Sequence, residues 1–233
     1  MPLSVEQTKF YPLYKLPRCY APFAKAPFRY TSTLQSPRQP VIWEKNVPSH
    51  RRPTRAEIAA AAGKTVADLI APNLKLLFCG INPGLYTAAI GHHFGRPGNR
   101  FWPALYAGGF TDRLLSPYEE HELLPHGYGI TNIVARASAR ADELTENELR
   151  AGARILERKV RRYRPQFVAF LGITAYRMAF ERPRAMLGLQ TDSLAEAKIW
   201  LLPSPSGLNA HHSPTSLARL FAELRQAVEG LSE

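Results

Sequence analysis

A carboxamide side chain, Asn82, lies in the Gly/Pro-rich segment Gly80-Ile81-Asn82-Pro83-Gly84, directly after the apolar run 74–79. A second loop, residues 203–209, follows the apolar residues 199–201 and carries small polar side chains between prolines and a glycine. In an open α/β sheet, the loops at the carboxyl ends of the strands are where ligands bind. Two such loops, both with a backbone that proline restricts, therefore indicate a site that binds a nucleotide.

The functional group of Asn82 limits the chemistry that is open to it. A carboxamide offers a donor and an acceptor, so it can hold a water molecule or hydrogen-bond a base edge, but it cannot act as a general base. The other interpretation is a turn asparagine that caps the end of a strand. The pentapeptide by itself is compatible with both.

A polar segment rich in glycine, residues 91–102, follows and contains His92, His93 and Phe94. A polar loop with one exposed aromatic ring is what a base-stacking platform needs. The two histidines could titrate near neutral pH or bind a metal, and the pair 211–212 would complete a four-histidine site. Because adjacent side chains diverge, we instead expect histidines that have protein partners or face solvent, and no metal.

Two further positions are open to two interpretations each. Asn132 interrupts the apolar run 128–134, and a buried asparagine must be hydrogen-bonded, so it is either a structural bridge or a base reader. Leu208 follows Gly207 in the second loop, where its apolar side chain resembles the wedges that insert into a base stack. The alternative for Leu208 is a loop leucine that folds onto the core.

The elements that must position these residues follow from hydrophobic periodicity and from capping signals. Strands are predicted at 74–79, 128–134, 167–171 and 199–202. Helices are predicted at 56–62, 101–109, 146–163, 174–180 and 215–228, with Ser213 as the N-cap of the last. The buried stripe of the helix at 146–163 is predicted to be Leu149, Ile155, Leu156 and Val160, and Pro165 should stop that helix. Strands that alternate with helices predict an α/β fold with a mostly parallel sheet.

The composition narrows the partners of the protein. The chain has 233 residues, 45% of them hydrophobic, which is enough for one domain with a core plus an extension. A net charge of +11 favours a polyanionic partner, DNA or RNA before a membrane surface. No apolar run is long enough to span a membrane, and the start of the chain has no apolar signal core. Cys19 and Cys79 are too few for a four-cysteine metal site, and Cys79 is predicted to be a small core residue.

Residues 1–54 differ from the rest in composition. Nine of the 20 prolines fall by Pro53, and residues 1–64 carry 11 Lys/Arg against three Glu, a balance of +8. Aromatic residues are mixed among them without a helical or strand period, which predicts a poorly ordered basic extension. Such an arm could track phosphates and stack on bases. The alternatives are a solvated extension, a misassigned start site or a transit-like segment.

Taken together, these motifs resemble one known family. From about Pro53 to the C-terminus the chain is similar to the mismatch-specific uracil/thymine-DNA glycosylases of the uracil-DNA glycosylase superfamily. The resemblance rests on four segments in the same order and spacing: residues 80–85, residues 91–102, residues 129–134 and residues 203–208. It implies a three-layer αβα sandwich around a short, mostly parallel sheet, with a glycosylase domain at 55–233 and the basic arm at 1–54 outside it.

The resemblance also implies an activity and a role for individual residues. The enzyme would remove uracil, and with it thymine or modified pyrimidines such as ethenocytosine, from double-stranded DNA, preferably opposite guanine, and leave an abasic site in base excision repair. Asn82 matches the catalytic asparagine that positions water, with His93 beside it. The base-binding residues would be Ile81, Thr87, Phe94 and Asn132. The DNA-binding residues would be Ser204, Ser206, Gly207, Leu208 and Asn209, with Leu208 in the wedge loop.

One departure from the family pattern concerns substrate range. Ser204 stands where many bacterial members have asparagine and the thymine-acting relatives have serine. The family implies no metal and no cofactor. Because no lysine lies in the motifs, no lyase activity is expected. We expect a monomer that acts in a bacterial cytoplasm, or in the nucleus if the source is eukaryotic.

Two other functions stay open at this stage. The first is a DNA-binding relative that recognises mismatches or damage without cleaving, which the retention of Asn82 disfavours. The second is an unrelated α/β enzyme that acts on a nucleotide or a phosphorylated small molecule. The sequence lacks a phosphate-binding Gly-Lys-Ser/Thr loop and a Gly-x-Gly-x-x-Gly turn, which disfavours this second alternative.

Overall fold

The protein is described here by a computed structural model, which covers residues 51–207 and 211–230. Its centre is a five-stranded sheet in the order β2-β1-β3-β5-β4. The first four strands in this order run parallel, and β4 pairs antiparallel with β5 at one edge. This arrangement confirms the mostly parallel sheet. The strands are β1 (Leu76–Gly80), β2 (Tyr128–Asn132), β3 (Phe167–Leu171), β4 (Gly188–Leu194) and β5 (Ala197–Leu202).

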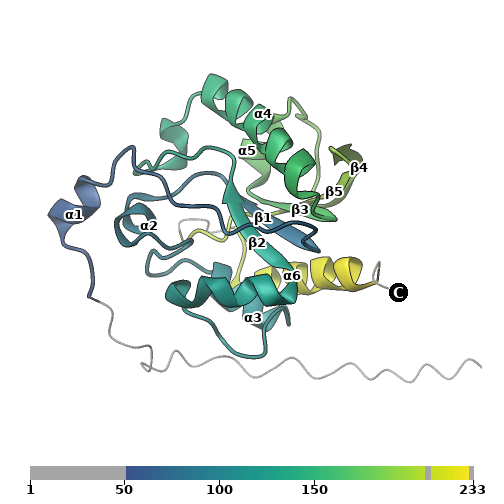
Figure 1. Ribbon diagram of the computed structural model, residues 1–233, viewed down its shortest axis with the longest axis horizontal. Coiled ribbons are helices and arrows are strands. Elements are labelled where there is room, and N and C mark those ends of the chain that lie inside the picture. The colour runs from purple at the N-terminus through teal and green to yellow at the C-terminus, as the bar shows by residue number, and fades with distance from the viewer. Residues whose placement is uncertain (1–50, 208–210, 231–233) are drawn as a thin grey trace, which may run out of the picture. The chain divides into compact units, whose positions relative to one another are not determined.

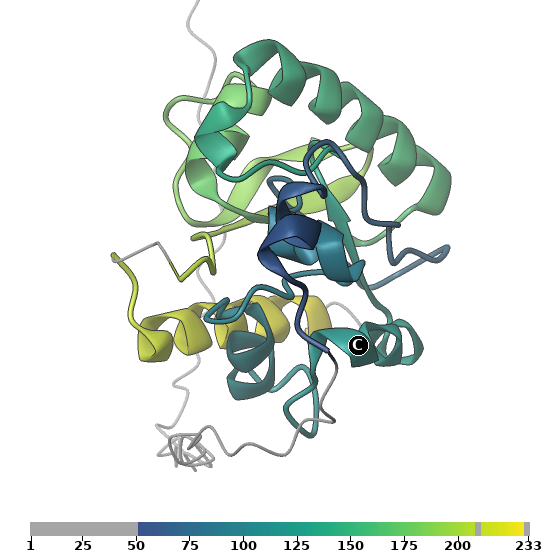
Figure 2. The same cartoon turned by 90° about the vertical axis from the view of Figure 1, so that its left-hand side faces the viewer.

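Helices cover both faces of the sheet. In Figure 1, α4 and α5 lie on one face and α3 and α6 on the other, and the turned view in Figure 2 keeps α6, in yellow, on the side of the sheet opposite α4. The three-layer αβα architecture is therefore confirmed. The helices are α1 (Arg55–Ala59), α2 (Leu85–Ile90), α3 (Phe101–Ala107), α4 (Glu146–Tyr163), α5 (Ile173–Ala179) and α6 (Pro214–Glu229), with the 3₁₀ segments η1 (Pro117–His126) and η2 (Ala141–Glu143).

The two layers of core follow from the alternation of side chains along each strand. Leu76 and Phe78 of β1 point into the cluster beneath α3 and α6, and the intervening Leu77 and Cys79 point into the cluster beneath α4 and α5. Because parallel strands are buried on both faces, they read as continuous apolar runs, which is why β1 and β3 are visible in the sequence. Cys79 is buried, as predicted for a small core residue.

Aromatic rings fill the core cluster beneath α3 and α6. The ring of Phe78 lies 5.3 Å from that of Phe101, 5.5 Å from Phe110 and 6.0 Å from Phe221. The first two pairs are edge-to-face and the third is stacked, and aromatic pairs of either kind add about 0.5–1.5 kcal/mol each beyond the burial of area. This packing joins β1 to α3 and α6 and so fixes the position of the strand end from which the β1 loop emerges.

Helix α4 has the predicted bounds, and three of the four residues of its predicted buried stripe are buried. Its buried apolar side chains are Leu149, Ala153, Leu156 and Val160, spaced by four, three and four residues. The prediction that Ile155 is buried is wrong, since the residue is 46% exposed. Successive side chains of a helix are rotated by about 100° about its axis, so Ile155 points away from the face on which its neighbour Leu156 is buried.

Some other boundaries and elements differ from the prediction. Strand β2 ends at Asn132 rather than continuing to 134, so Asn132 terminates the strand instead of interrupting it. Helix α2 and strand β4 were not predicted. Gly84 is the N-cap of α2 and offers no side-chain cap. Strand β4 is a largely exposed edge strand whose sequence lacks an apolar face. Ser213 is the N-cap of α6, as predicted, and accepts from the Ser216 backbone.

The topology brings the carboxyl ends of the four parallel strands to the same end of the sheet. Gly80, Asn132, Leu171 and Leu202 are the last residues of β1, β2, β3 and β5. The loops that follow them therefore emerge side by side, where ligands of open α/β sheets bind. No helix in the described part of the chain is long and apolar enough to cross a membrane.

Candidate active site

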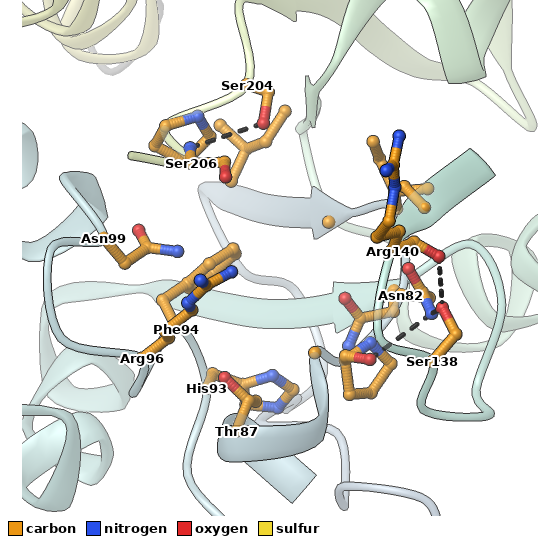
Figure 3. A pocket seen from close by; sticks show the side chains of 18 of the residues that line it. Asn82, Thr87, His93, Phe94, Arg96, Asn99, Ser138, Arg140, Ser204 and Ser206 are labelled. Carbon is orange, nitrogen blue, oxygen red and sulfur yellow. Dashed lines mark hydrogen bonds between the residues drawn. The ribbon is translucent and has the colours of Figure 1, made fainter. Parts of the chain in front are cut away.

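A cavity of about 150 Å³ opens at the carboxyl edge of the parallel strands (Figure 3). Pockets for drug-sized ligands hold about 300–1,000 Å³, so this space suits a single small ring. Its walls come from the loops after β1, β2 and β5 and from segment 87–99. The lining residues are Gly80, Ile81, Asn82, Pro83, Gly84, Thr87, His93, Phe94, Arg96, Asn99, Asn132, Ser138, Ala139, Arg140, Ala141, Leu171, Ser204, Pro205 and Ser206.

Asn82 is held in one orientation through its amide nitrogen. Nδ2 donates to the hydroxyl of Ser138 at 2.8 Å, to the carbonyl of Arg136 at 3.1 Å and to the carbonyl of Pro83 at 3.3 Å. These three acceptors fix which end of the carboxamide is nitrogen. Within the described residues Oδ1 receives no hydrogen bond, so it is left as an acceptor for a ligand or a water molecule.

Ser138 is a site residue that sequence reasoning missed. Its hydroxyl donates to the Arg140 carbonyl at 2.6 Å, which turns a lone pair toward Asn82. Its backbone nitrogen donates to the Pro83 carbonyl at 3.2 Å, so the loops after β1 and β2 are joined directly. The sequence shows only a serine six positions after Asn132, and nothing in that spacing places it against Asn82.

The loop that carries Ser138 is anchored to the start of α4. The Arg136 guanidinium forms an ion pair with Glu148 at 2.5 Å. Hydrogen bonds from Arg136, with further ones from Thr145, lower the pKa of Glu148 to about 2. Glu148 also completes the capping box of Thr145. One carboxylate therefore ties the helix end to the loop whose carbonyl and hydroxyl orient Asn82.

Asn132 faces the same cavity in a different environment. It is 8% exposed, lies opposite Gly80 in the register of β1 and β2, and lines the cavity. No residue that the structure describes forms a hydrogen bond with its side chain. Buried carboxamides are normally satisfied. The structural bridge left open by the sequence is therefore not observed among these residues, and the donor and acceptor of Asn132 are available to a ligand.

Gly80 keeps open the space between Asn132 and Phe94. A Cβ atom at position 80 would lie 2.4 Å from Asn132 Oδ1 and 3.4 Å from Phe94 Cζ. The first of these separations is a collision, so any larger side chain would displace Asn132. The glycine at the end of β1 therefore leaves the space that the Asn132 carboxamide occupies beside the cavity.

Phe94 is an aromatic wall with a strained backbone. Its φ is +53°, a region that non-glycine residues rarely occupy and that is often found at functional sites. The ring stacks on Phe101 with centroids 4.1 Å apart and 25° between the planes. Phe101 covers one face, and the half-buried ring lines the cavity (Figure 3). Phe94 was expected to be exposed, and its partial burial comes from this stacking.

His93 is buried and neutral. Its Nε2 lies 2.9 Å from the Ala67 carbonyl, an acceptor, so Nε2 carries the proton and Nδ1 is an acceptor. Its backbone nitrogen donates to Glu120 at 2.8 Å, and its carbonyl accepts from Trp102 Nε1 at 3.1 Å. Burial lowers the pKa of His93, against the opposing effect of the Glu120 carboxylate. At neutral pH this cavity-lining ring can accept a hydrogen bond at Nδ1 but holds no proton to give there.

The neighbouring histidine points elsewhere. His92 Nδ1 lies 3.0 Å from Glu120 Oε1, and its ring packs edge-on against Tyr118. The two adjacent rings therefore diverge, as their adjacency predicted. Within residues 51–207 and 211–230, no group of three or more His, Cys, Asp or Glu is placed to hold a metal ion.

Thr87 and Ile81 line the cavity and also support its walls. The Thr87 hydroxyl accepts from the Gly95 backbone at 3.2 Å and so braces the loop that carries Phe94. The carbonyl of Ile81 accepts from Val134, and its side chain packs with the cluster beneath α4 and α5, near Gly172. Both residues predicted to bind the base are thus brought to the cavity.

The loop after β5 closes the opposite side. Ser204 and Ser206 line the cavity, and the Ser206 backbone donates to Ser204 Oγ at 3.3 Å. Gly207 is exposed and lies against the Gly98 carbonyl, which would be 2.7 Å from a Cβ at position 207. Leu208 and Asn209, the other predicted DNA-binding residues, fall outside the described residues, and so does nearly all of the predicted arm at 1–54.

The charge around the cavity is positive. No carboxylate is among its lining residues. Arg140 pairs with Asp142 at 2.5 Å. Arg96 is exposed and forms neither an ion pair nor a hydrogen bond with any described residue. The site can therefore bind an anion at its rim, and it offers no carboxylate as a general base.

The chain is similar to one known protein family and to one solved structure. A model of the family named "Uracil DNA glycosylase superfamily" matches residues 67–228, which include every part of the cavity. The solution NMR structure of a candidate uracil DNA glycosylase from Methanosarcina acetivorans is also similar, at 16% identity over 70% of this chain and 98% of that one, with a TM-score of 0.47. The structural likeness is weak, and the family match carries the assignment.

Proposed function

Because this chain belongs to the uracil DNA glycosylase superfamily, we propose that it is a monofunctional DNA glycosylase that excises uracil from double-stranded DNA, preferably from G·U mismatches. The products are a free base and an abasic site. The protein is proposed to act as a monomer in base excision repair. Thymine and modified pyrimidines such as ethenocytosine are the further substrates to be tested.

The observation that carries this proposal is the fixed orientation of Asn82. Its amide nitrogen donates to Ser138, Arg136 and Pro83, so Oδ1 is the free end of the carboxamide. A water molecule that donates a hydrogen bond to Oδ1 would keep its own lone pair for attack. Preorganisation of this kind lowers a barrier because no reorganisation is needed at the moment of reaction.

The size of the cavity supports a mechanism in which the base leaves the duplex. The cavity suits one small ring, and its aromatic wall is Phe94. A base inside a stack cannot reach it, so the nucleotide must be flipped out, at a cost of a few kcal/mol. That cost is lowest at a mismatch, which supports a preference for G·U over A·U. Asn132, with a free donor and acceptor, is proposed to read the edge of the flipped base.

The chemical step follows from the charges that surround the cavity. The C1′–N1 bond breaks first, and its electron pair goes to the base, which leaves as an anion while the sugar becomes an oxocarbenium-like cation. Water held by Asn82 then bonds to C1′ and releases its proton to solvent or to the departing base. The rim is cationic and the lining lacks a carboxylate, an arrangement that favours the anionic leaving group. Because the oxocarbenium-like sugar is strongly electrophilic, water adds to it without activation by a general base.

The test is base release from a labelled duplex that contains a single G·U pair, with A·U, G·T, G·ethenocytosine and single-stranded uracil in parallel. Asn82→Ala is the matched variant, because it removes the carboxamide and leaves the loop glycines and proline in place. We expect alkali-labile sites at G·U with the wild type, and a loss of about 100- to 1,000-fold in the variant with DNA binding retained.

Other results would contradict the proposal. Tight, salt-sensitive binding without base release on any substrate would make the protein a mismatch-binding relative. Unchanged base release by Asn82→Ala would remove the asparagine from the reaction.

A further inference from the structure

Glu120 is a buried carboxylate whose two oxygens both contact one short segment next to the cavity. The residue lies in η1, is 5% exposed and is not among the residues that line the cavity. Its Oε2 accepts from the backbone nitrogen of His93 at 2.8 Å, and its Oε1 lies 3.0 Å from Nδ1 of His92. Because a carboxylate can only accept, Nδ1 is the donor of this second hydrogen bond. Glu120 therefore holds the two residues that lead directly into Phe94.

The carboxylate is itself attached to a rigid part of the fold. Leu123 of the same 3₁₀ segment is fully buried in the core cluster beneath α3 and α6, and Ser116 caps the start of the segment together with Glu119. A buried carboxylate is costly unless it is hydrogen-bonded, so Glu120 cannot turn away from its two donors without a loss of stability. Segment 92–93 is therefore held at a fixed point of the core.

The backbone on both sides of Phe94 is held by side chains from two different elements. On one side the His93 N–H donates to Glu120, and on the other the Gly95 N–H donates to the hydroxyl of Thr87, in α2, at 3.2 Å. The φ of +53° at Phe94 lies between these two hydrogen bonds. Strained backbone conformations persist only where the surrounding structure over-determines them. Loss of one of the two hydrogen bonds should therefore let residue 94 relax and carry its ring away from the cavity wall.

The other contacts of His93 limit the effect that is expected from Glu120. Nε2 of His93 donates to the Ala67 carbonyl at 2.9 Å, and the His93 carbonyl accepts from Trp102 Nε1 at 3.1 Å. These contacts hold the ring and the carbonyl of His93, whereas Glu120 accepts from its amide. A change at Glu120 should therefore displace the Phe94 ring and leave the rest of the loop and the fold in place.

We propose that Glu120 is a positioning residue for base excision: through the amide of His93 it keeps Phe94 in its strained conformation, so that the ring forms the wall on which the flipped base stacks. This inference rests on the proposed function, because it takes a flipped base as the occupant of the cavity. It assigns Glu120 no contact with the base, the water or the sugar. The reach of the side chain and an acceptor oxygen are what the task needs, and the negative charge is not required.

Two variants separate the reach of the side chain from its charge. Glu120→Gln keeps the length and an acceptor oxygen for the His93 N–H, and its amide nitrogen can donate to Nδ1 of a neutral His92 ring. Glu120→Asp keeps the charge but is one methylene shorter, so it cannot hold the same donors in the same place. Glu122→Gln is the matched control, because it changes a carboxylate of the same segment that is 51% exposed and paired with Arg113.

The measurement is single-turnover release of uracil from the labelled G·U duplex, with affinity for a duplex without uracil and a thermal melt in parallel. We expect Glu120→Asp to lower the rate by about ten- to 100-fold, as a displacement of about 1 Å at the site would. Glu120→Gln and Glu122→Gln should stay within about threefold of the wild type, and affinity for the duplex without uracil should change by less than about threefold in every variant.

A double-mutant cycle with Phe94→Ala shows whether the effect passes through the ring. If Glu120 acts by positioning Phe94, Glu120→Asp should cause little further loss once the ring has been removed, because the two changes then act on one interaction. Losses that add on the logarithmic scale would mean that Glu120 acts elsewhere, and they would overturn the proposal.

Other outcomes also contradict this inference. Wild-type release by Glu120→Asp would remove the need for reach, and a loss confined to Glu120→Gln would make charge the requirement. If Glu120→Asp does not fold, Glu120→Gln carries the test, since a loss of about tenfold or more in that folded variant would overturn the proposal. A wild-type protein that releases no uracil from any duplex would instead contradict the proposed function, and this inference with it.

Discussion

Two asparagines stand at the ends of two neighbouring strands and differ in their surroundings. Asn82 follows β1 by two residues, and Asn132 is the last residue of β2. Both line the same cavity. The amide nitrogen of Asn82 has three protein acceptors, whereas the side chain of Asn132 has no hydrogen-bond partner among the described residues.

The difference indicates two different tasks for one functional group. A carboxamide whose nitrogen is occupied presents a single acceptor in a fixed direction, which suits the binding of water. A carboxamide with both ends free presents a donor and an acceptor together, which suits the recognition of a base edge. The residue type alone does not distinguish these tasks. The hydrogen-bond partners of each side chain do.

The largest expected effect comes from position 80, where β1 lies in register with Asn132. In Gly80→Ala the new Cβ would collide with Asn132 Oδ1, so the reading carboxamide must shift while Asn82 keeps its acceptors. A displacement of about 1 Å at an active site can cost about 100-fold in rate. Because the methyl group would also contact Phe94 and the displaced carboxamide would take space from the base, we expect a loss of at least that size in single-turnover base release at G·U, with a folded protein.

Gly84→Ala is the matched control for this change. Its φ is −73°, and a Cβ there would meet no heavy atom within 4 Å. A much smaller loss than in Gly80→Ala is expected. Equal losses in the two variants would show that glycine is needed for loop conformation and not for the space next to Asn132.

The second prediction changes Asn132 itself. Asn132→Ala removes a donor and an acceptor, and a bidentate base contact is worth about 1–3 kcal/mol, or about five- to 150-fold. We expect uracil release to fall by about 30-fold, with less discrimination between uracil and other pyrimidines opposite guanine. Rates on a panel of G·pyrimidine duplexes provide the measurement.

Asn132→Asp sharpens this test because it keeps the shape and removes the donor. It should lose uracil release about as much as the alanine variant does. A uniform decrease on all substrates with unchanged ranking would count against a reading role for Asn132.

The smallest expected effect concerns the support of Asn82. Ser138→Ala removes one of three acceptors and leaves the carbonyls of Arg136 and Pro83. One such hydrogen bond contributes about 1 kcal/mol, so single-turnover base release should fall about five- to tenfold, with affinity for DNA unchanged.

Ser138→Thr keeps the hydroxyl and should retain most of the activity. A full loss of activity in Ser138→Ala would mean that the hydroxyl contacts the reacting groups directly. No effect would mean that the two carbonyls orient Asn82 without it.

The elements that were predicted well are those with strong local signals. The bounds of α4 and β3 matched, because α4 has a capping box and a following proline, and β3 is a short buried apolar run. Strand β4 and helix α2 were missed. An exposed edge strand has no apolar face to reveal it, and α2 lacks a side-chain cap. Ile155 was misplaced because a one-residue error in helical phase moves a side chain off the buried face.

For the site, the sequence alone predicted which loops line the cavity and which functional groups they carry, since a glycine- and proline-bounded asparagine after an apolar strand is a local pattern. It also determined the positive charge and the membership of the uracil DNA glycosylase superfamily. Only the tertiary structure decided what each group can do. Ser138 lies 56 residues from Asn82, and the Ser206 carbonyl accepts from the side chain of Arg100, which lies 106 residues away. Hydrogen bonds over such separations depend on how the strands are ordered in the sheet, and this order leaves no trace in local spacing.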